Sequence, residues 1–146
     1  MMKRNTFIIL FIIGVWILPS CKTYLIPLES FEHQFAGIDS TSLKEVRIEG
    51  AAYDTYLANP IEKIDCIDKQ GNAFQLDNSP AIEIRFSYGE KNKRTIFYFD
   101  RVIMQDTLII GGQSRFIPSL IKAIPFNSVS KIEVQNGGKN FKYVDK

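Results

Sequence analysis

The feature that most constrains this chain is an alternation of apolar and polar residues with a period of two, which begins near residue 43 and recurs toward the end. Over residues 43–49, Val46 and Ile48 fall on one side and charged residues on the other, and residues 82–88 repeat the pattern. Such a period places one set of side chains on a single face of a β-strand. Only residues 118–122 suggest a turn of helix, so we predict a mainly β fold.

Short turns separate the predicted strands and indicate antiparallel pairing. Residues 61–68 and 73–76 flank a turn that contains Gly71, and residues 82–88 and 95–104 flank one that begins at Gly89. Because residues 95–104 are apolar on both faces, we expect that strand to lie in the centre of a sheet. Further strands are predicted at residues 107–110, 122–126, 130–135 and 141–144, all within a single small domain.

Residues 80–146 resemble the small curled β-barrels of the SH3 and Sm type. The resemblance lies in a long bent hairpin at 82–104, a short third strand at 107–110, and the strand, tight turn and strand of residues 123–134. It implies a partly open barrel in the C-terminal part, to which an N-terminal hairpin is added. A β-sandwich is the alternative.

The N-terminus has the layout of a secretory signal. Lys3 and Arg4 precede an uncharged apolar run at residues 7–18. A run of 12 residues is too short for a hydrocarbon core, which requires about 20, and it matches the apolar region of a cleavable signal. The first alanine is Ala36, so a signal cleavage site of the Ala-x-Ala kind is missing.

The run ends in Leu18-Pro19-Ser20-Cys21, which resembles the lipobox of bacterial lipoproteins. The resemblance implies cleavage before Cys21, a diacylglycerol on its sulphur and a third acyl chain on its amine. It also implies localisation to the cell envelope. The family's inner-membrane retention signal resembles an aspartate at the second position, where this chain has Lys22, so the resemblance implies the periplasmic side of an outer membrane. The alternative is an uncleaved membrane anchor in which Cys21 is an incidental thiol.

These observations predict three segments: a signal peptide at 1–20, a lipidated N-terminus and tether at 21–41, and a β-rich domain at 42–146. The tether has an apolar content that a solvated linker does not need, so we expect part of it to pack on the domain or lie at the bilayer interface. Its apolar residues are Tyr24, Leu25, Ile26, Leu28, Phe31 and Phe35.

Removal of residues 1–20 lowers the count of basic residues from 18 to 16, which equals the 16 acidic residues. The basic precursor is therefore no indication of nucleic-acid binding. The charge is uneven, because residues 22–84 carry 5 basic and 11 acidic side chains, and residues 85–146 carry 11 and 5. Either the two halves pack against each other, or the basic half faces an anionic partner such as lipid head groups or a cell-wall polymer.

The sequence offers few residues for catalysis. His33 is the only histidine, and Cys66 is the only thiol besides Cys21, so neither a nucleophilic triad nor a zinc site is expected. The glycine-rich residues 111–115 and 136–139 do not fit a phosphate-binding loop and are expected to be turns. Cys66 is expected to be a small buried apolar residue. We therefore expect no catalytic residue, cofactor or metal.

Cations beside aromatic residues are the remaining candidates, and such groups bind anionic polymers, sugars or proteins. The candidate binding residues are Arg94, Arg101, Arg115 and Tyr98. The leading hypothesis is a non-enzymatic binding or assembly module with an envelope protein or anionic polymer as its partner. One alternative is an inhibitor that inserts residues 111–118, with Arg115 projecting, into a secreted hydrolase. Another is a hydrolase with a polar pocket. Ligand and oligomeric state stay open.

Overall fold

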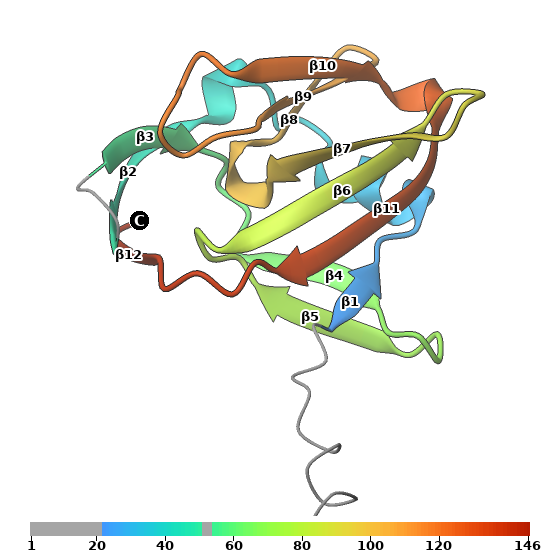
Figure 1. Cartoon of the computed structure of the whole chain (residues 1–146), viewed down its shortest axis with the longest axis horizontal. Coiled ribbons are helices and arrows are strands. Elements are labelled where there is room, and N and C mark those ends of the chain that lie inside the picture. The colour runs from blue at the N-terminus through green and yellow to red at the C-terminus, as the bar shows by residue number, and fades with distance from the viewer. Residues whose placement is uncertain (1–21, 51–53) are drawn as a thin grey trace, which may run out of the picture.

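Figure 1 shows the computed structural model, which describes residues 22–50 and 54–146. The predicted mainly β fold is confirmed: the strands are β1 (Thr23–Leu25), β2 (Lys44–Glu49), β3 (Asp54–Ala58), β4 (Lys63–Ile67), β5 (Ala73–Asp77), β6 (Ile82–Tyr88), β7 (Lys93–Tyr98), β8 (Ile103–Gln105), β9 (Leu108–Gly112), β10 (Ile121–Pro125), β11 (Val129–Asn136) and β12 (Lys142–Asp145). The helices are α2 (Leu28–Gln34) and the short 3-10 helices η1 (Ser40–Ser42), η2 (Phe99–Arg101) and η3 (Phe126–Ser128).

The strands form three antiparallel sheets. The largest has the order β5-β4-β1-β11-β6-β7, the second the order β10-β9-β8, and the third the order β12-β2-β3. The expected hairpins β4–β5 and β6–β7 are both present, and η3 makes the tight turn between β10 and β11. β11 then pairs with β6, but the sheets do not close into a barrel.

The strand expected at 95–104 differs from its prediction. β7 ends at Tyr98 and is the last strand of its sheet, so it is an edge strand. The chain turns through η2 and enters the second sheet as β8. Phe99 and Val102 are fully buried by this change of direction. The apolar residues on either side of Asp100 and Arg101 therefore mark a crossing of the core rather than one strand covered on both faces.

The segment predicted as a tether belongs to the folded domain. β1 pairs with β11 and β4 inside the largest sheet, and the Ile26 N–H donates to the Ile132 carbonyl at 3.0 Å. Phe31 and Phe35, four residues apart around α2, lie on its inner side and are 0% and 1% exposed. The domain thus begins near residue 22 rather than at 42, because these apolar residues complete its core. The predicted signal peptide and Cys21 lie outside the described residues.

Two further expectations concern small residues. Cys66 is buried as predicted: its thiol donates to the Phe74 carbonyl at 3.3 Å, and burial raises its pKa to about 11. Gly111 and Gly112, expected in a turn, lie in β9 instead. A β-carbon on Gly111 would overlap the Phe97 ring, and one on Gly112 would overlap the Arg101 guanidinium. These glycines therefore allow two large side chains to pack flat on the strand.

Candidate functional site

A buried ion pair lies where the third sheet meets the rest of the domain. Asp100 of η2 is 0% exposed and Arg115, between β9 and β10, is 6% exposed. The Arg115 Nη2 and Nη1 atoms donate to Asp100 Oδ1 and Oδ2 at 2.8 and 3.2 Å. Such a bidentate ion pair offsets part of the free energy that is needed to remove both charges from water.

Two tyrosines complete the coordination of this carboxylate. Tyr56 of β3 and Tyr143 of β12 both donate their hydroxyls to Asp100 Oδ2, Tyr143 at 2.7 Å. Burial, and then the nearby negative charge of Asp100, raise the pKa of both tyrosines well above the ordinary value of 10.0. They are therefore neutral donors at physiological pH. Arg115 also donates to the Pro80 carbonyl, so the cluster ties together segments that are distant in the sequence.

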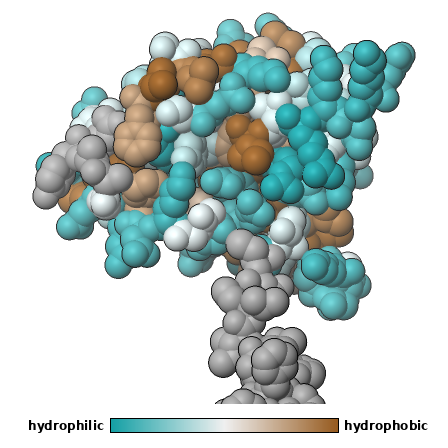
Figure 2. Space-filling model, viewed as in Figure 1, coloured by the Kyte–Doolittle hydropathy of each residue, from teal (hydrophilic) through white to brown (hydrophobic). Residues whose placement is uncertain are grey.

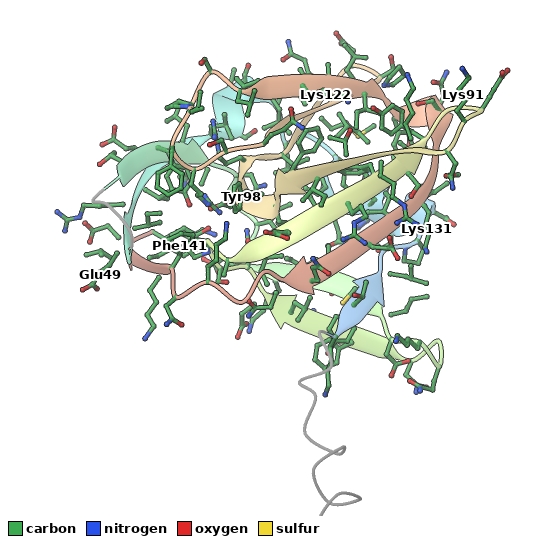
Figure 3. The ribbon with its side chains drawn as sticks, viewed as in Figure 1. Glu49, Lys91, Tyr98, Lys122, Lys131 and Phe141 are labelled. Atoms are coloured by element: carbon green, nitrogen blue, oxygen red, sulfur yellow. The ribbon has the colours of Figure 1, made fainter. Side chains whose placement is uncertain are left out.

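Aromatic faces cover the guanidinium of the pair. The Arg115 Cζ atom lies 4.0 Å from the ring centroid of Tyr98 and 4.8 Å from that of Tyr56. Lys139 donates to the Tyr98 hydroxyl at 2.9 Å, and its Nζ atom lies 5.9 Å from the Phe141 ring centroid. Figure 3 shows Tyr98 and Phe141 on the same side of the molecule. Because Asp100 is enclosed and its oxygens accept four hydrogen bonds, this polar cluster holds the fold together rather than offering a free base.

An apolar groove of about 380 Å³ lies next to the polar cluster, between β3 and the second sheet. Tyr56 belongs to both, since its hydroxyl binds Asp100 and its side chain lines the groove. The other lining residues are Leu43, Thr55, Leu57, Arg101, Ile103, Ile110, Gly111, Gly112, Pro118 and Ile121.

Large apolar side chains are exposed around this groove. Leu57 and Ile121, which line it, are 54% and 56% exposed. The loop between β9 and β10 adds Phe116, Ile117 and Leu120 to the exposed set. Figure 2 shows apolar side chains gathered at the upper left, over this loop and the adjoining end of β10. Contiguous exposed apolar surface commonly marks an interaction site.

The predicted binding residues do not form one exposed surface. Arg115 and Tyr98 come together, but inside the polar cluster. Arg101 lies at the groove, where it donates to the carbonyls of Ser114 and of Pro118, the latter at 3.0 Å. Arg94 is exposed on β7 opposite Ser87, toward the other end of that strand.

The loop at 111–118 does not present Arg115, as the inhibitor hypothesis requires. The Ser114 Oγ atom accepts hydrogen bonds from the backbone N–H groups of Phe116 and Ile117, both at 3.1 Å. The resulting turn leaves these two side chains 66% and 53% exposed while Arg115 points inward. The inhibitor hypothesis treated residues 111–118 as an exposed loop, but the side chains that project from it are Phe116 and Ile117 rather than Arg115.

A second hollow, of about 310 Å³, lies beside β1 and the turn between β4 and β5. Its lining includes Lys22, Lys69 and Gln70, together with Tyr24 and Phe74, whose rings stack with centroids 4.6 Å apart. Figure 1 shows that β1 begins at the lower end of the domain, whereas β10 and its preceding loop lie at the upper end. The apolar groove is therefore distant from the point at which the chain enters the fold.

Within residues 22–50 and 54–146, no group of three or more His, Cys, Asp or Glu side chains is placed to hold a metal ion. His33 is exposed in the last turn of α2. No helix in this part of the chain is long and apolar enough to cross a membrane.

Comparison with known proteins returned no match: no family model fits the chain, and neither the curated proteins nor the solved structures contain a similar one. The function is therefore argued from the groove and the polar cluster themselves.

Proposed function

We propose that this protein is a lipid-anchored lipoprotein of the bacterial envelope, and that its domain is a binding module without enzymatic activity. The Leu18-Pro19-Ser20-Cys21 motif supports the anchor, because it combines an aliphatic residue, a small residue and a cysteine at the end of a signal-like run. With three acyl chains on Cys21 the protein stays on its membrane, since one chain alone gives only marginal binding.

The exposed apolar groove is the observation that carries the binding function. Leu57 and Ile121, which line the groove, are more than half exposed, and Phe116, Ile117 and Leu120 of the loop before β10 extend the exposed apolar surface beside it. The groove is lined by residues of β3, β9 and β10, which lie in the upper part of the domain, whereas β1 lies in the lower part, so the groove is distant from the proposed anchor (Figure 1). That placement favours a partner protein of the envelope over the anchor's own bilayer as the bound species.

The two alternatives receive less support from the geometry. The proposed inhibitor required Arg115 to project, and Arg115 is buried in an ion pair. A hydrolase required a concave pocket with several catalytic side chains. Among the described residues that line the groove, the polar ones are Thr55, Tyr56 and Arg101, and none is a histidine or a carboxylate.

The anchor is tested with Cys21→Ser expressed in a Gram-negative host that processes lipoproteins. We expect wild-type protein in the membrane fraction, labelled by an alkynyl fatty acid, and the variant released or retained as an unprocessed precursor. The matched control is Cys66→Ser, which keeps the lipobox cysteine. A Cys21→Ser variant that is still acylated and membrane-bound contradicts the proposal.

A further inference from the structure

One wall of the groove is the free edge of a β-strand. Among the described residues, β3 is the last strand of the third sheet and pairs only with β2, from Lys44 opposite Ala58 to Ile48 opposite Asp54. In an antiparallel pair, alternate residues direct their N–H and C=O groups away from the neighbour. Along β3 these outward groups have no strand partner among the described residues.

One side of the groove is lined by three consecutive residues of β3. Side chains alternate between the two faces of a strand, so consecutive residues seldom line one hollow through their side chains alone. Thr55, Tyr56 and Leu57 nevertheless all line this groove. Three consecutive residues do so when the strand presents its edge, with the backbone groups between the side chains.

The opposite wall is apolar and fixed in position. Ile103, Ile110 and Ile121 come from the three strands of the second sheet, and Gly112 contributes no side chain. The guanidinium of Arg101 holds the neighbouring loop through the Ser114 and Pro118 carbonyls. On the β3 side, the bond from Tyr56 to Asp100 fixes the strand. The two walls therefore have complementary chemistry, hydrogen bonding on one side and apolar on the other.

We propose that this groove binds an extended peptide segment of a partner protein, which adds to β3 as a further strand and places alternate apolar side chains against the second sheet. The inference rests on the proposed binding function and specifies its partner. β3 has five residues, and paired strands match residue for residue, so the segment that pairs with it is about five residues long. Such strand addition obtains affinity from backbone hydrogen bonds and specificity from every second side chain.

The backbone edge argues against an acyl chain as the occupant. A hydrocarbon in the groove would cover the outward N–H and C=O groups of β3 without bonding them, and a buried polar group without a hydrogen-bond partner is unfavourable. An extended peptide supplies donors and acceptors in the required order. Apolar side chains at alternate positions match the isoleucines of the opposite wall.

The experiment uses the mature lipidated protein in nanodiscs, against which a phage library of random dodecapeptides is selected. We expect the enriched peptides to carry apolar residues at every second position. A synthetic peptide of the enriched sequence is then N-methylated one residue at a time. Strand addition predicts about tenfold or greater weakening at alternate positions and little effect at the positions between them, because only every second N–H pairs with β3.

A pair of matched variants locates the binding. Ile121→Asp places a charge in the groove at a side chain that is already 56% exposed, whereas Leu108→Asp makes the same kind of change at a 38% exposed leucine of the same sheet that is absent from the groove lining. We expect Ile121→Asp to lose the peptide and Leu108→Asp to keep it. Circular dichroism checks that both variants are folded.

Several outcomes overturn the inference. These are enrichment of no peptide, an N-methyl pattern without a period of two, and equal loss of binding in the two variants. If no peptide binds, but a fluorescent fatty acid binds the wild type and not Ile121→Asp, the ligand of the groove is a lipid and not a peptide. The binding function then still holds. Self-association that Ile121→Asp abolishes, again without peptide binding, assigns the groove to a second copy. The anchor is judged separately, by Cys21→Ser.

Discussion

The domain joins its layers in two different ways. On the side covered by α2, the contact is aromatic: Phe31 stacks on Phe35 with centroids 4.4 Å apart and meets the edge of Phe86 at 5.5 Å. On the side of the third sheet, the contact is polar and is centred on Asp100 and Arg115. Apolar packing gains free energy in proportion to buried area and depends little on direction. A buried ion pair depends strongly on direction and contributes little net free energy.

The difference explains where the candidate site lies. Aromatic packing stabilises the large sheet, while the polar cluster holds β3 through the Tyr56 hydroxyl and through the Asn59 N–H, which donates to the Asp100 carbonyl at 2.7 Å. Tyr56 also lines the groove, so the polar contact centred on Asp100, and not the aromatic one, adjoins the exposed apolar surface. Retention of a costly buried pair at this place fits a requirement for a fixed strand edge.

The largest effect is expected in the apolar region. Ile132 of β11 is 1% exposed, whereas the neighbouring Lys131 is exposed and pairs with Glu133 at 2.9 Å. Ile132→Asp leaves a carboxylate without a partner in the core, at a cost of several kcal/mol that is comparable to the stability of a whole domain. We expect it to unfold the protein and Lys131→Asp to be tolerated. Thermal melts of the two variants decide this, and equal midpoints would show that the strand register is wrong.

The next largest effect compares the two junctions directly. Arg115→Met removes the partner of a fully buried carboxylate and is expected to cost about 3–5 kcal/mol. Phe35→Met in the aromatic junction changes shape but not polarity and is expected to cost about 1.5 kcal/mol or less. Urea denaturation measures both. Adding Asp100→Asn to Arg115→Met should restore part of the lost stability, because the uncompensated buried charge is then absent. If the double variant loses as much stability as the two single variants together, Asp100 and Arg115 do not stabilise each other as a pair.

Alkaline pH should weaken the polar junction selectively. The pKa values of Tyr56 and Tyr143 are raised in the folded protein, by burial first and by Asp100 second, so the unfolded chain loses these protons earlier. Their contribution to stability is fully present below about pH 10 and declines as pH rises further. Cys66 adds a change of the same sign between about pH 9 and 11. Denaturation curves at pH 8, 10 and 11 should show this decline in the free energy of unfolding. The double variant Tyr56→Phe and Tyr143→Phe should lose less stability over the same pH range. If the double variant loses as much stability as the wild type, the decline belongs to other groups.

The apolar junction was largely accessible from sequence, and the polar one was not. Periodicity of two located β2, β4, β6 and β11, because their buried and exposed faces alternate in the sequence itself. The Asp100 cluster left no such pattern, since Tyr56 and Tyr143 are each more than 40 residues from it in the chain. Arg115 was predicted as a surface cation for the same reason: a charged residue looks solvated until its partner is known. The groove likewise depends on how β3 is placed against β9, which is a tertiary property.

Charge reversal at two arginines is expected to give the smallest effects, and it separates surface charge from structural charge. Arg101→Glu removes the hydrogen bonds to the Ser114 and Pro118 carbonyls and should cost about 1–3 kcal/mol, together with a loosened loop. Arg94→Glu changes an exposed side chain and should stay within about 0.5 kcal/mol of the wild type.

The comparison also tests whether the basic second half packs on the acidic first half through its charges. One ion pair between the halves, Arg47 with Asp145, has its signs the other way round, with the cation in the first half and the carboxylate in the second. A double variant of Arg94→Glu and Arg101→Glu should therefore melt at nearly the temperature of Arg101→Glu alone, since the two sites act independently. A large additional fall in the midpoint caused by Arg94→Glu would place this cation against the acidic half after all. If the fall is small, Arg94 is free to meet an anionic partner, and loss of that association in Arg94→Glu should be mimicked in the wild type by raising the salt concentration.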